Sequence, residues 1–185
     1  MIHKKSNAFL AFIIMLVLLT ASISLGAYRS WSAQKAEVEQ SKGSLFEMLT
    51  ATREIGSNIL SVARRHLPKD DEKIVGLQKD IDDLARNSSF SQLAGANERF
   101  ENNAITLLAD LKSLSSVQAD ARDLMYVEQM LPQALEKSAR MTEQSEYNQQ
   151  ALAFNTEMNK RFSGKVAQLL GIKPAEEFAV SEVKK

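Results

Sequence analysis

The stretch that decides the fold is EYNQQALAFN, residues 146–155, which is followed by AQLLGIKPAEEF, residues 167–178. The pairs Tyr147-Asn148 and Phe154-Asn155 are seven residues apart, and seven residues make two helical turns that drift by only ~20°. Asn148 and Asn155 therefore lie on one face of a helix, and Tyr147 and Phe154 lie on the stripe beside it. The pattern predicts a long helix and a class of helical protein, and it identifies no reaction or ligand.

The composition predicts an all-α protein. The 185 residues include three prolines, seven glycines and no cysteine. Runs rich in Ala, Leu, Glu, Gln, Lys and Arg favour helices, and β-branched residues are too scattered to form alternating strands. Without cysteine there are no disulfides, so stability must come from packing. Lys plus Arg equals Asp plus Glu at 23 each, which predicts no nucleic-acid partner because no global field attracts one.

A single membrane span is predicted near the N-terminus. The stretch from Ala8 to Ala27 contains no charged residue, and ~20 helical residues cross a hydrocarbon core of about 30 Å. We expect a short cytoplasmic N-terminus at 1–7 and a transmembrane signal-anchor at 8–27. The alternative is a signal peptide cleaved after Ser24, because Thr20 to Ser24 is small and polar. We favour the uncleaved anchor.

Residues at the two ends of the span predict its placement. Tyr28 and Trp31 follow the apolar stretch on one side of a helix, where amphipathic rings favour the headgroup level, so both are predicted membrane-interface anchors. Lys4 and Lys5 precede the span, and Arg29 and Lys35 follow it, so the count of positive residues is close to a tie. The free amino group and His3 give a slight positive-inside bias toward a cytoplasmic N-terminus. We therefore expect a single-pass protein of the cytoplasmic (inner) membrane whose C-terminal domain lies outside the cytoplasm.

Residues 28–179 are predicted to form one helical domain, with a flexible tail at 180–185. The first helix of this domain continues the membrane helix and ends near His66, just before Pro68. Acidic residues from Asp70 onward start the second helix. Apolar or small residues at three- and four-residue steps give the two helices their core faces, at Leu45, Leu49, Thr52, Ile55, Ile59 and Val62 and then at Ile74, Leu77, Ile81 and Leu84.

Two serine-to-glutamine spacings mark the next helix starts. Ser89 with Gln92 and Ser115 with Gln118 match a capping box, in which two otherwise unpaired amide donors are satisfied. They predict the starts of a third and a fourth helix. The core face of the third helix is predicted at Phe100, Ala104, Leu107 and Leu111, widened by Ile105 and Leu108.

The fourth helix is expected to be the longest. Pro132 lies inside it and lacks an amide, which predicts a kink or boundary near Met130 or Leu131. Ser163-Gly164 is expected to end the helix, and a short turn from Lys165 to Leu170 should follow. Its heptad seam is formed by Leu124, Leu131, Ser138, Ser145 and Leu152 at one position and by Val127, Ala134, Met141, Asn148, Asn155 and Phe162 at the other.

The two quoted tracts resemble the C-terminal signature of the LemA family, which are membrane-anchored bacterial helical proteins. The family pattern is Tyr-Asn, five residues, Tyr-Asn, then Ala-x-Leu-Leu-Gly-Phe and a later Phe. The family's Phe-Pro step falls on Arg161-Phe162 and is lost, and Gln144 and Ser145 replace an arginine pair. The residues that match are Tyr147, Asn148, Phe154 (for Tyr), Asn155, Ala167, Leu169, Leu170, Gly171, Ile172 (for Phe), Lys173, Pro174 and Phe178.

The resemblance implies a single N-terminal anchor and an antiparallel bundle of about four long helices, the packing typical of chains with short connections. The family brings no established enzymatic activity. Gly171, Pro174 and Phe178 would then form a helix-termination motif.

The aromatic and amide pairs each have two interpretations. Asn148 and Asn155 could contact a ligand or partner, but a polar residue at a seam position more often sets helix register. Tyr147 and Phe154 could form an exposed recognition stripe, but aromatic residues at helical spacing usually belong to a core.

No catalytic, cofactor-binding or metal-binding residue is predicted. Asp80, Asp82 and Asp83 resemble a cation site, but adjacent helix positions point in different directions, so we interpret them as a solvated face. His66 is the only histidine after the membrane segment, and one imidazole without cysteine does not make a zinc site. No nucleophile elbow or phosphate loop is present, so we expect no enzyme.

The leading hypothesis is a non-enzymatic membrane-tethered helical interaction module, an adaptor or cell-envelope scaffold with a protein partner and a possible homo-oligomeric state. The alternative is an extracytoplasmic sensory or ligand-binding bundle that works with a partner subunit.

Overall fold

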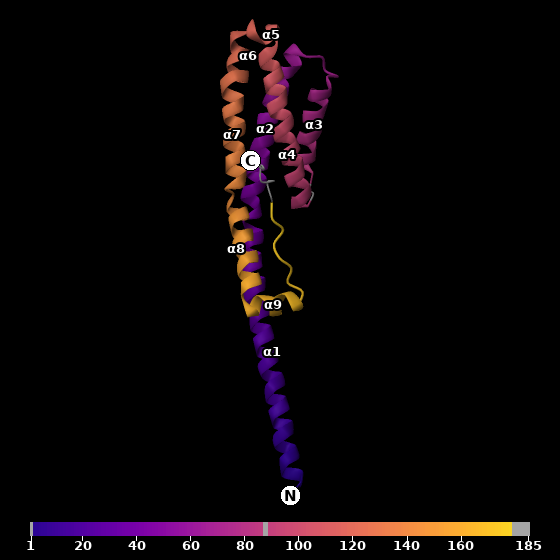
Figure 1. Cartoon of the computed structure of the whole chain (residues 1–185), viewed down its shortest axis with the longest axis vertical. Helices are drawn as coiled ribbons and strands as arrows, with labels where there is room; N and C mark the ends of the chain where they lie inside the picture. Colours follow the sequence, from indigo (N-terminus) through magenta and orange to yellow (C-terminus); the bar gives the residue numbers. More distant parts are fainter. Residues whose placement is uncertain (1, 87–88, 179–185) are drawn as a thin grey trace. The chain divides into compact units, whose positions relative to one another are not determined.

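The described part of the chain is helical and contains no strand, which confirms the all-α prediction. The computed structural model describes residues 2–86 and 89–178, and only the backbone of residues 2–7; the predicted tail at 180–185 lies outside this range, as do the side chains of Lys4 and Lys5. The elements shown in Figure 1 are α1 (Ile2–Gln40), α2 (Lys42–His66), α3 (Glu72–Ala85), α4 (Phe90–Ser113), α5 (Ser115–Gln118), α6 (Ala121–Met125), a π-helical segment η1 (Tyr126–Met130), α7 (Leu131–Glu143), α8 (Glu146–Lys160) and α9 (Phe162–Leu169).

Internal contacts divide the described chain into two units. The N-terminal unit contains residues 2–40 and 150–175, and the bundle unit contains the described residues of 41–149 together with 176–178.

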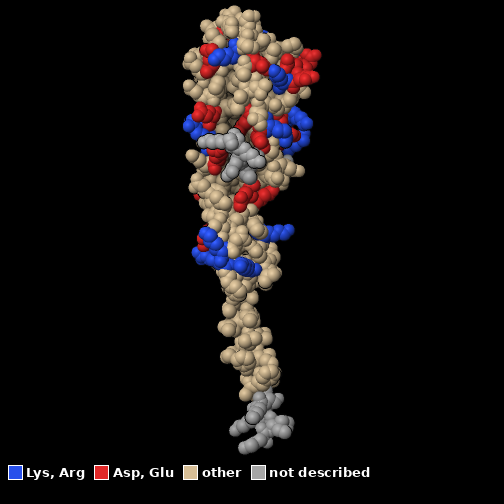
Figure 2. All heavy atoms as spheres, in the orientation of Figure 1, with Lys and Arg blue, Asp and Glu red and all other residues tan. Residues whose placement is uncertain are grey.

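The N-terminal unit contains a helix that is long and apolar enough to cross a membrane, the one such helix among the described residues. Its large apolar side chains are exposed from Phe9, at 66%, to Leu25, at 56%. Figure 2 shows this part of α1 without charged side chains. The expected apolar segment at 8–27 is therefore a continuous helix with an apolar surface.

In the bundle unit, α2, α3, α4 and α7 pack against one another (Figure 1). Helix α2 ends at His66, as predicted, because Pro68 follows the C-cap residue Leu67. Gly56 permits a close approach on this helix. A Cβ at Gly56 would lie 2.5 Å from Phe100 Cε2 and 2.8 Å from Ile81 Cδ1, so only glycine fits without a shift of these side chains.

One of the two predicted capping boxes forms. Ser89 Oγ accepts from the Gln92 amide at 3.4 Å and Gln92 Oε1 accepts from the Ser89 amide at 3.3 Å, so α4 begins as predicted. At Ser115 a helix starts as predicted, but the capping box is wrong: α5 begins with Ser115, its N-cap is Leu114 without a side-chain hydrogen bond, and it ends at Gln118. Asp120 starts the next helix instead, and its Oδ1 accepts from the amides of Arg122 at 3.0 Å and Asp123 at 3.1 Å.

The expected fourth helix is divided into α5, α6, η1, α7 and α8, so the prediction that it is the longest is wrong: its longest piece, α8, has 15 residues and α4 has 24. The predicted boundary beside Pro132 is confirmed, since the wide turn η1 ends at Met130 and α7 starts at Leu131. The widened turn accommodates a residue that has no amide to donate. A second break at Gln144 and Ser145 was not predicted.

These breaks change the predicted seam. Val127, Leu131 and Ser138 are buried. Met141, Leu152 and Phe162 were predicted to face the seam and are instead exposed, at 45%, 58% and 75%. An uninterrupted heptad fails because the π-helical turn adds a residue and the break restarts the helix.

Candidate functional site

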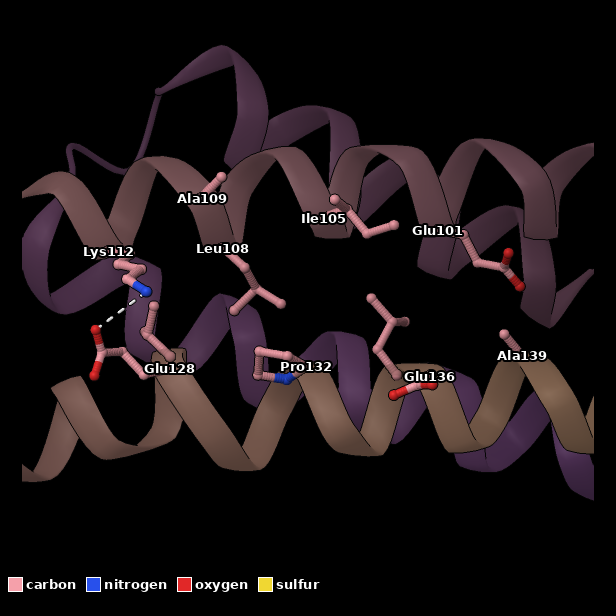
Figure 3. A pocket seen from close by; sticks show the side chains of 11 residues that line it. Glu101, Ile105, Leu108, Ala109, Lys112, Glu128, Pro132, Glu136 and Ala139 are labelled. Atoms are coloured by element: carbon pink, nitrogen blue, oxygen red, sulfur yellow. Dashed lines mark ion pairs between the residues drawn. The ribbon is translucent and has the colours of Figure 1, made fainter. Parts of the chain in front are cut away.

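An open groove of about 470 Å³ lies between α4 and the η1–α7 segment of the bundle unit. Lys112 of α4 lies beside Glu128 at one end, and Glu101 of α4 lies toward Ala139 of α7 at the other, so the two walls run in opposite chain directions (Figure 3).

The walls of the groove are apolar along its length. Leu108, Val127 and Leu135 form a buried floor, each at most 5% exposed. Pro132 lies between Glu128 and Glu136 along the second wall (Figure 3). The π-helical turn and the proline that follows it therefore line this groove.

Ile105 is the main difference from the predicted core. It was expected to widen the buried face of α4, but its side chain is 59% exposed and lines the groove. Helical periodicity places Ile105 beside Leu108, but it does not show that η1 and α7 leave this position uncovered.

The charged residues of the groove are distributed unevenly. Lys112 Nζ lies 3.3 Å from Glu128 Oε1 and links the two walls at one end (Figure 3). Glu136 Oε1 pairs with Arg140 Nη2 at 3.0 Å along α7. Glu101, at the other end, accepts a hydrogen bond from the neutral amide of Asn97 at 2.7 Å.

Electrostatics make Glu101 unusual. Burial raises the pKa of Glu101 above its usual value, the hydrogen bond from Asn97 opposes that shift, and the negative charges of Glu143 and Glu98 raise the pKa further. A positive charge at this end of the groove would therefore stabilise the ionised form of Glu101.

Tyr147 is a buried anchor within the bundle unit. Its side chain is fully buried, its hydroxyl donates to the carbonyl oxygen of Glu176, and its ring lies 4.7 Å from Phe90 between centroids. Phe178 packs edge-on against Phe90 at 6.4 Å. Phe178, predicted as part of a helix-termination motif, thus fixes the irregular C-terminal segment instead. Phe90, which joins both contacts, was missed because the capping signal identified only its place at a helix start.

Asn148 closes the break between α7 and α8. Its Nδ2 donates to the carbonyl oxygen of Thr142 at 3.1 Å, and its amide donates to Ser145 Oγ at 3.3 Å. Ser145 therefore caps α8, and Asn148 satisfies a carbonyl at the end of α7.

Asn155 binds a peptide group within the N-terminal unit. Its Nδ2 donates to the carbonyl oxygen of Ala175 at 2.9 Å, and its Oδ1 accepts from the Ala175 amide at 2.8 Å. Asn148 and Asn155 were expected either to contact a ligand or partner or to set helix register. The structure shows that both amides bind the backbone of their own chain.

Trp31, a predicted membrane-interface anchor, is packed inside the N-terminal unit. It is 2% exposed, its ring is edge-on to Phe154 at 5.5 Å, and its Nε1 donates to Ser163 Oγ at 3.3 Å. These partners lie far along the sequence, so periodicity around the apolar stretch could not reveal them. Tyr28 is 45% exposed.

Gly171 ends α9 as predicted. With φ at +94°, it allows the Ile172 amide to donate to the Ala167 carbonyl and its own amide to the Gln168 carbonyl, both at 3.0 Å. Pro174 follows in the irregular segment.

The prediction that Ser163-Gly164 ends the preceding helix is wrong. Helix α8 already ends at Lys160, and Gly164 lies in α9. A Cβ at Gly164 would overlap the Met158 carbonyl, so this glycine permits close backbone packing rather than helix termination.

Asp123 is a buried carboxylate of α6 that binds two residues at the end of α2. Arg65 donates to both of its oxygens, and His66 Nε2 lies 2.8 Å from Oδ2. The hydrogen bond from Arg65 lowers the pKa of Asp123 to about 2, against the opposing effect of burial. The network joins the end of α2 to α6.

The aspartates of α3 only partly match the expected solvated face. Asp82 is exposed, but Asp80 is 3% exposed and accepts hydrogen bonds from Asn103 at 2.6 Å and Arg99 at 3.4 Å. Among the described residues no group of His, Cys, Asp and Glu side chains is arranged to hold a metal ion.

Comparison with models of protein families, with curated proteins and with solved structures found no match for this chain.

Proposed function

We propose that this protein is a membrane-tethered helical interaction module whose groove between α4 and α7 receives a partner protein. The observation that carries the proposal is an open apolar groove with Ile105 exposed on its wall. Exposed apolar side chains that line a groove are typical of binding surfaces. The long apolar helix α1 supports the tether.

The proposal includes the family and the topology that the sequence suggested. We propose a LemA-like protein with an antiparallel bundle of about four helices, anchored once in a bacterial inner membrane. The bundle unit would lie outside the cytoplasm. The end of α9 at Gly171 and the buried Tyr147 support the resemblance to the LemA family, because both features fall on residues that match the family signature.

We propose no catalytic activity, although Ser116, His66 and Asp123 are linked in the order of a hydrolase triad. Ser116 Oγ lies 3.1 Å from His66 Nδ1, and His66 Nε2 lies 2.8 Å from Asp123. Arg65 binds both oxygens of Asp123, so the carboxylate serves an ion pair between helices. Covalent labelling of Ser116 by a fluorophosphonate probe would contradict this proposal.

Site-specific photocrosslinking in intact cells tests the interaction. A photoreactive residue at Ile105 should give a discrete adduct in the membrane fraction, and the same residue at Val75 should give none. Val75 is a matched control because it is a β-branched residue that is 55% exposed on α3, outside the groove. Equal adducts from the two positions would contradict the proposal.

Protease accessibility tests the orientation of the anchor. If the bundle unit lies outside the cytoplasm, it should be digested once the outer barrier is opened, while the inner membrane remains intact. Protection until the inner membrane is broken would place the bundle unit in the cytoplasm.

The alternative is a sensory or ligand-binding bundle, and the size of the groove favours it as a second candidate. A volume of about 470 Å³ falls within the range of small-molecule sites. Thermal stabilisation of the full-length protein by a metabolite, lost on Leu108→Ala substitution but kept on Val75→Ala substitution, would support this function.

A further inference from the structure

The shape of the groove fits a helix. Glu101, Ile105, Leu108 and Lys112 line one wall at steps of four, three and four residues, so the wall is about 16 Å long at 1.5 Å per residue. The other wall runs beside it along η1 and α7 (Figure 3). An apolar channel of about three turns between two helices matches the site that a third, amphipathic helix fills.

The charges of the groove indicate the sign of the partner. Three of its four charged residues are glutamates, and the single cation, Lys112, is paired with Glu128. Glu101 has a neutral hydrogen-bond donor, and its neighbours Glu98 and Glu143 carry the same sign. A lysine or arginine beside Glu101 would therefore gain an ion pair without displacing an existing cation.

We propose that the groove binds a basic amphipathic helix of a partner protein. Its apolar stripe would lie against Ile105, Leu108 and Leu135, and a lysine or arginine about one turn beyond the stripe would pair with Glu101. This inference rests on the proposed interaction function and adds the chemical class of the partner.

The test uses the full-length protein in nanodiscs of zwitterionic lipid and two stapled peptides of about 14 residues. Both peptides carry leucines at i, i+3, i+4 and i+7; one carries flanking lysines and the other carries glutamates at the same positions. Binding is measured by fluorescence anisotropy, and empty nanodiscs correct for adsorption to lipid. The basic peptide should bind at least about tenfold more tightly, which corresponds to about 1.4 kcal/mol.

Two pairs of variants locate the binding. Ile105→Glu should abolish binding of the basic peptide, and Val75→Glu, an equivalent change outside the groove, should leave it unchanged. Glu101→Gln should remove most of the preference for the basic peptide while Glu54→Gln, on the exposed surface of α2, should keep it. Because Ile105 and Val75 are both exposed, neither change disturbs a packed core.

Three results would overturn the inference. The first is equal affinity for the two peptides, and the second is binding that persists in Ile105→Glu. The third is concentration-dependent dimerisation that Ile105→Glu abolishes, because it would identify a second copy of this chain as the occupant of the groove. The proposed interaction function is tested separately, and it fails if photoreactive residues at Ile105 and Val75 give equal adducts in cells. If the photoreactive residue at Ile105 captures a partner in cells whose crosslinked segment is an acidic or uncharged helix, the interaction function stands and the inference is wrong.

Discussion

Single residues carry functions that periodicity alone does not assign. The repeated Tyr-Asn and Phe-Asn pairs suggested one continuous face, but each member has a different partner. Asn148 caps a carbonyl at the end of α7, and Asn155 binds the peptide group of Ala175. The spacing predicted a helix and a role in packing because both follow from local geometry. It could not predict backbone partners 20 residues away, since those depend on tertiary structure.

Asp123 is predicted to stabilise the bundle unit through its charge. Asp123→Asn should lower the free energy of unfolding by about 2 kcal/mol at pH 7, because it removes the buried negative charge that pairs with Arg65. Asp82→Asn, on the exposed side of α3, should change it by less than about 0.5 kcal/mol. Urea unfolding of both variants in detergent micelles measures the difference.

The same residue predicts a pH dependence. The pKa of Asp123 falls from 3.8 to about 2 on folding, so its contribution is complete above pH 3.8 and is lost as pH falls toward 2. The unfolding free energy of the wild type should therefore fall more steeply than that of Asp123→Asn over this interval. Parallel profiles would show that the carboxylate is not held by Arg65 in solution.

Glu101 should have the opposite effect. Its pKa is raised in the folded protein, so the ionised carboxylate opposes folding at neutral pH and this cost disappears as pH falls through the raised pKa. Glu101→Gln should therefore raise the melting temperature at pH 7 and give no increase near pH 4. A residue that reduces stability while lining a groove is typical of a binding site. A lower melting temperature at pH 7 would contradict this account.

At the scale of helices, local chemistry predicted four of the starts and ends. The end of α2 before Pro68, the capping box of Ser89, the boundary before Pro132 and the Gly171 end all follow from local chemistry. The break at Gln144 was missed because neither proline nor glycine marks it. The groove was missed because the exposure of Ile105 depends on where α7 packs against α4. Packing between helices that are distant in sequence leaves no periodic pattern in the sequence of α4 or of α7.

Two glycines of α2 should respond oppositely to alanine. Gly56→Ala should destabilise the bundle unit by about 2 kcal/mol, because the new Cβ meets Phe100 and Ile81. Gly43→Ala meets no atom within 4 Å and should stabilise the helix by about 0.5–1 kcal/mol. Thermal or urea unfolding of the two variants gives the comparison, and equal effects would contradict the predicted close packing at Gly56.

The segment after α9 should be released by one substitution in α8. Asn155→Ala removes both hydrogen bonds to Ala175, so the Ala175 amide should lose protection against hydrogen exchange by about tenfold or more. Asn102→Ala, at an exposed position of α4, is the control. Unchanged protection in Asn155→Ala would mean that other contacts hold the segment.

For the whole molecule, the prediction that matters most is attachment to the membrane. The full-length protein should resist alkaline extraction, because α1 presents an uncharged apolar stretch of membrane-spanning length. Leu16→Lys, near the middle of the uncharged stretch, should weaken membrane insertion by about 2.5–3.5 kcal/mol and increase the extracted fraction. A lysine at Glu54 is the control. Complete extraction of the wild type would contradict the tether.

The pairing of Asn155 with Ala175 involves only main-chain atoms of residue 175. These hydrogen bonds therefore do not depend on the side chain at residue 175. Because Ala175 is buried, the size of that side chain is the remaining constraint. Serine or glycine could replace Ala175 without loss of either hydrogen bond, whereas no substitute for Asn155 other than glutamine offers a donor and an acceptor on one amide. Related sequences should therefore vary at residue 175, which contributes only main-chain atoms, and should keep an amide side chain at residue 155.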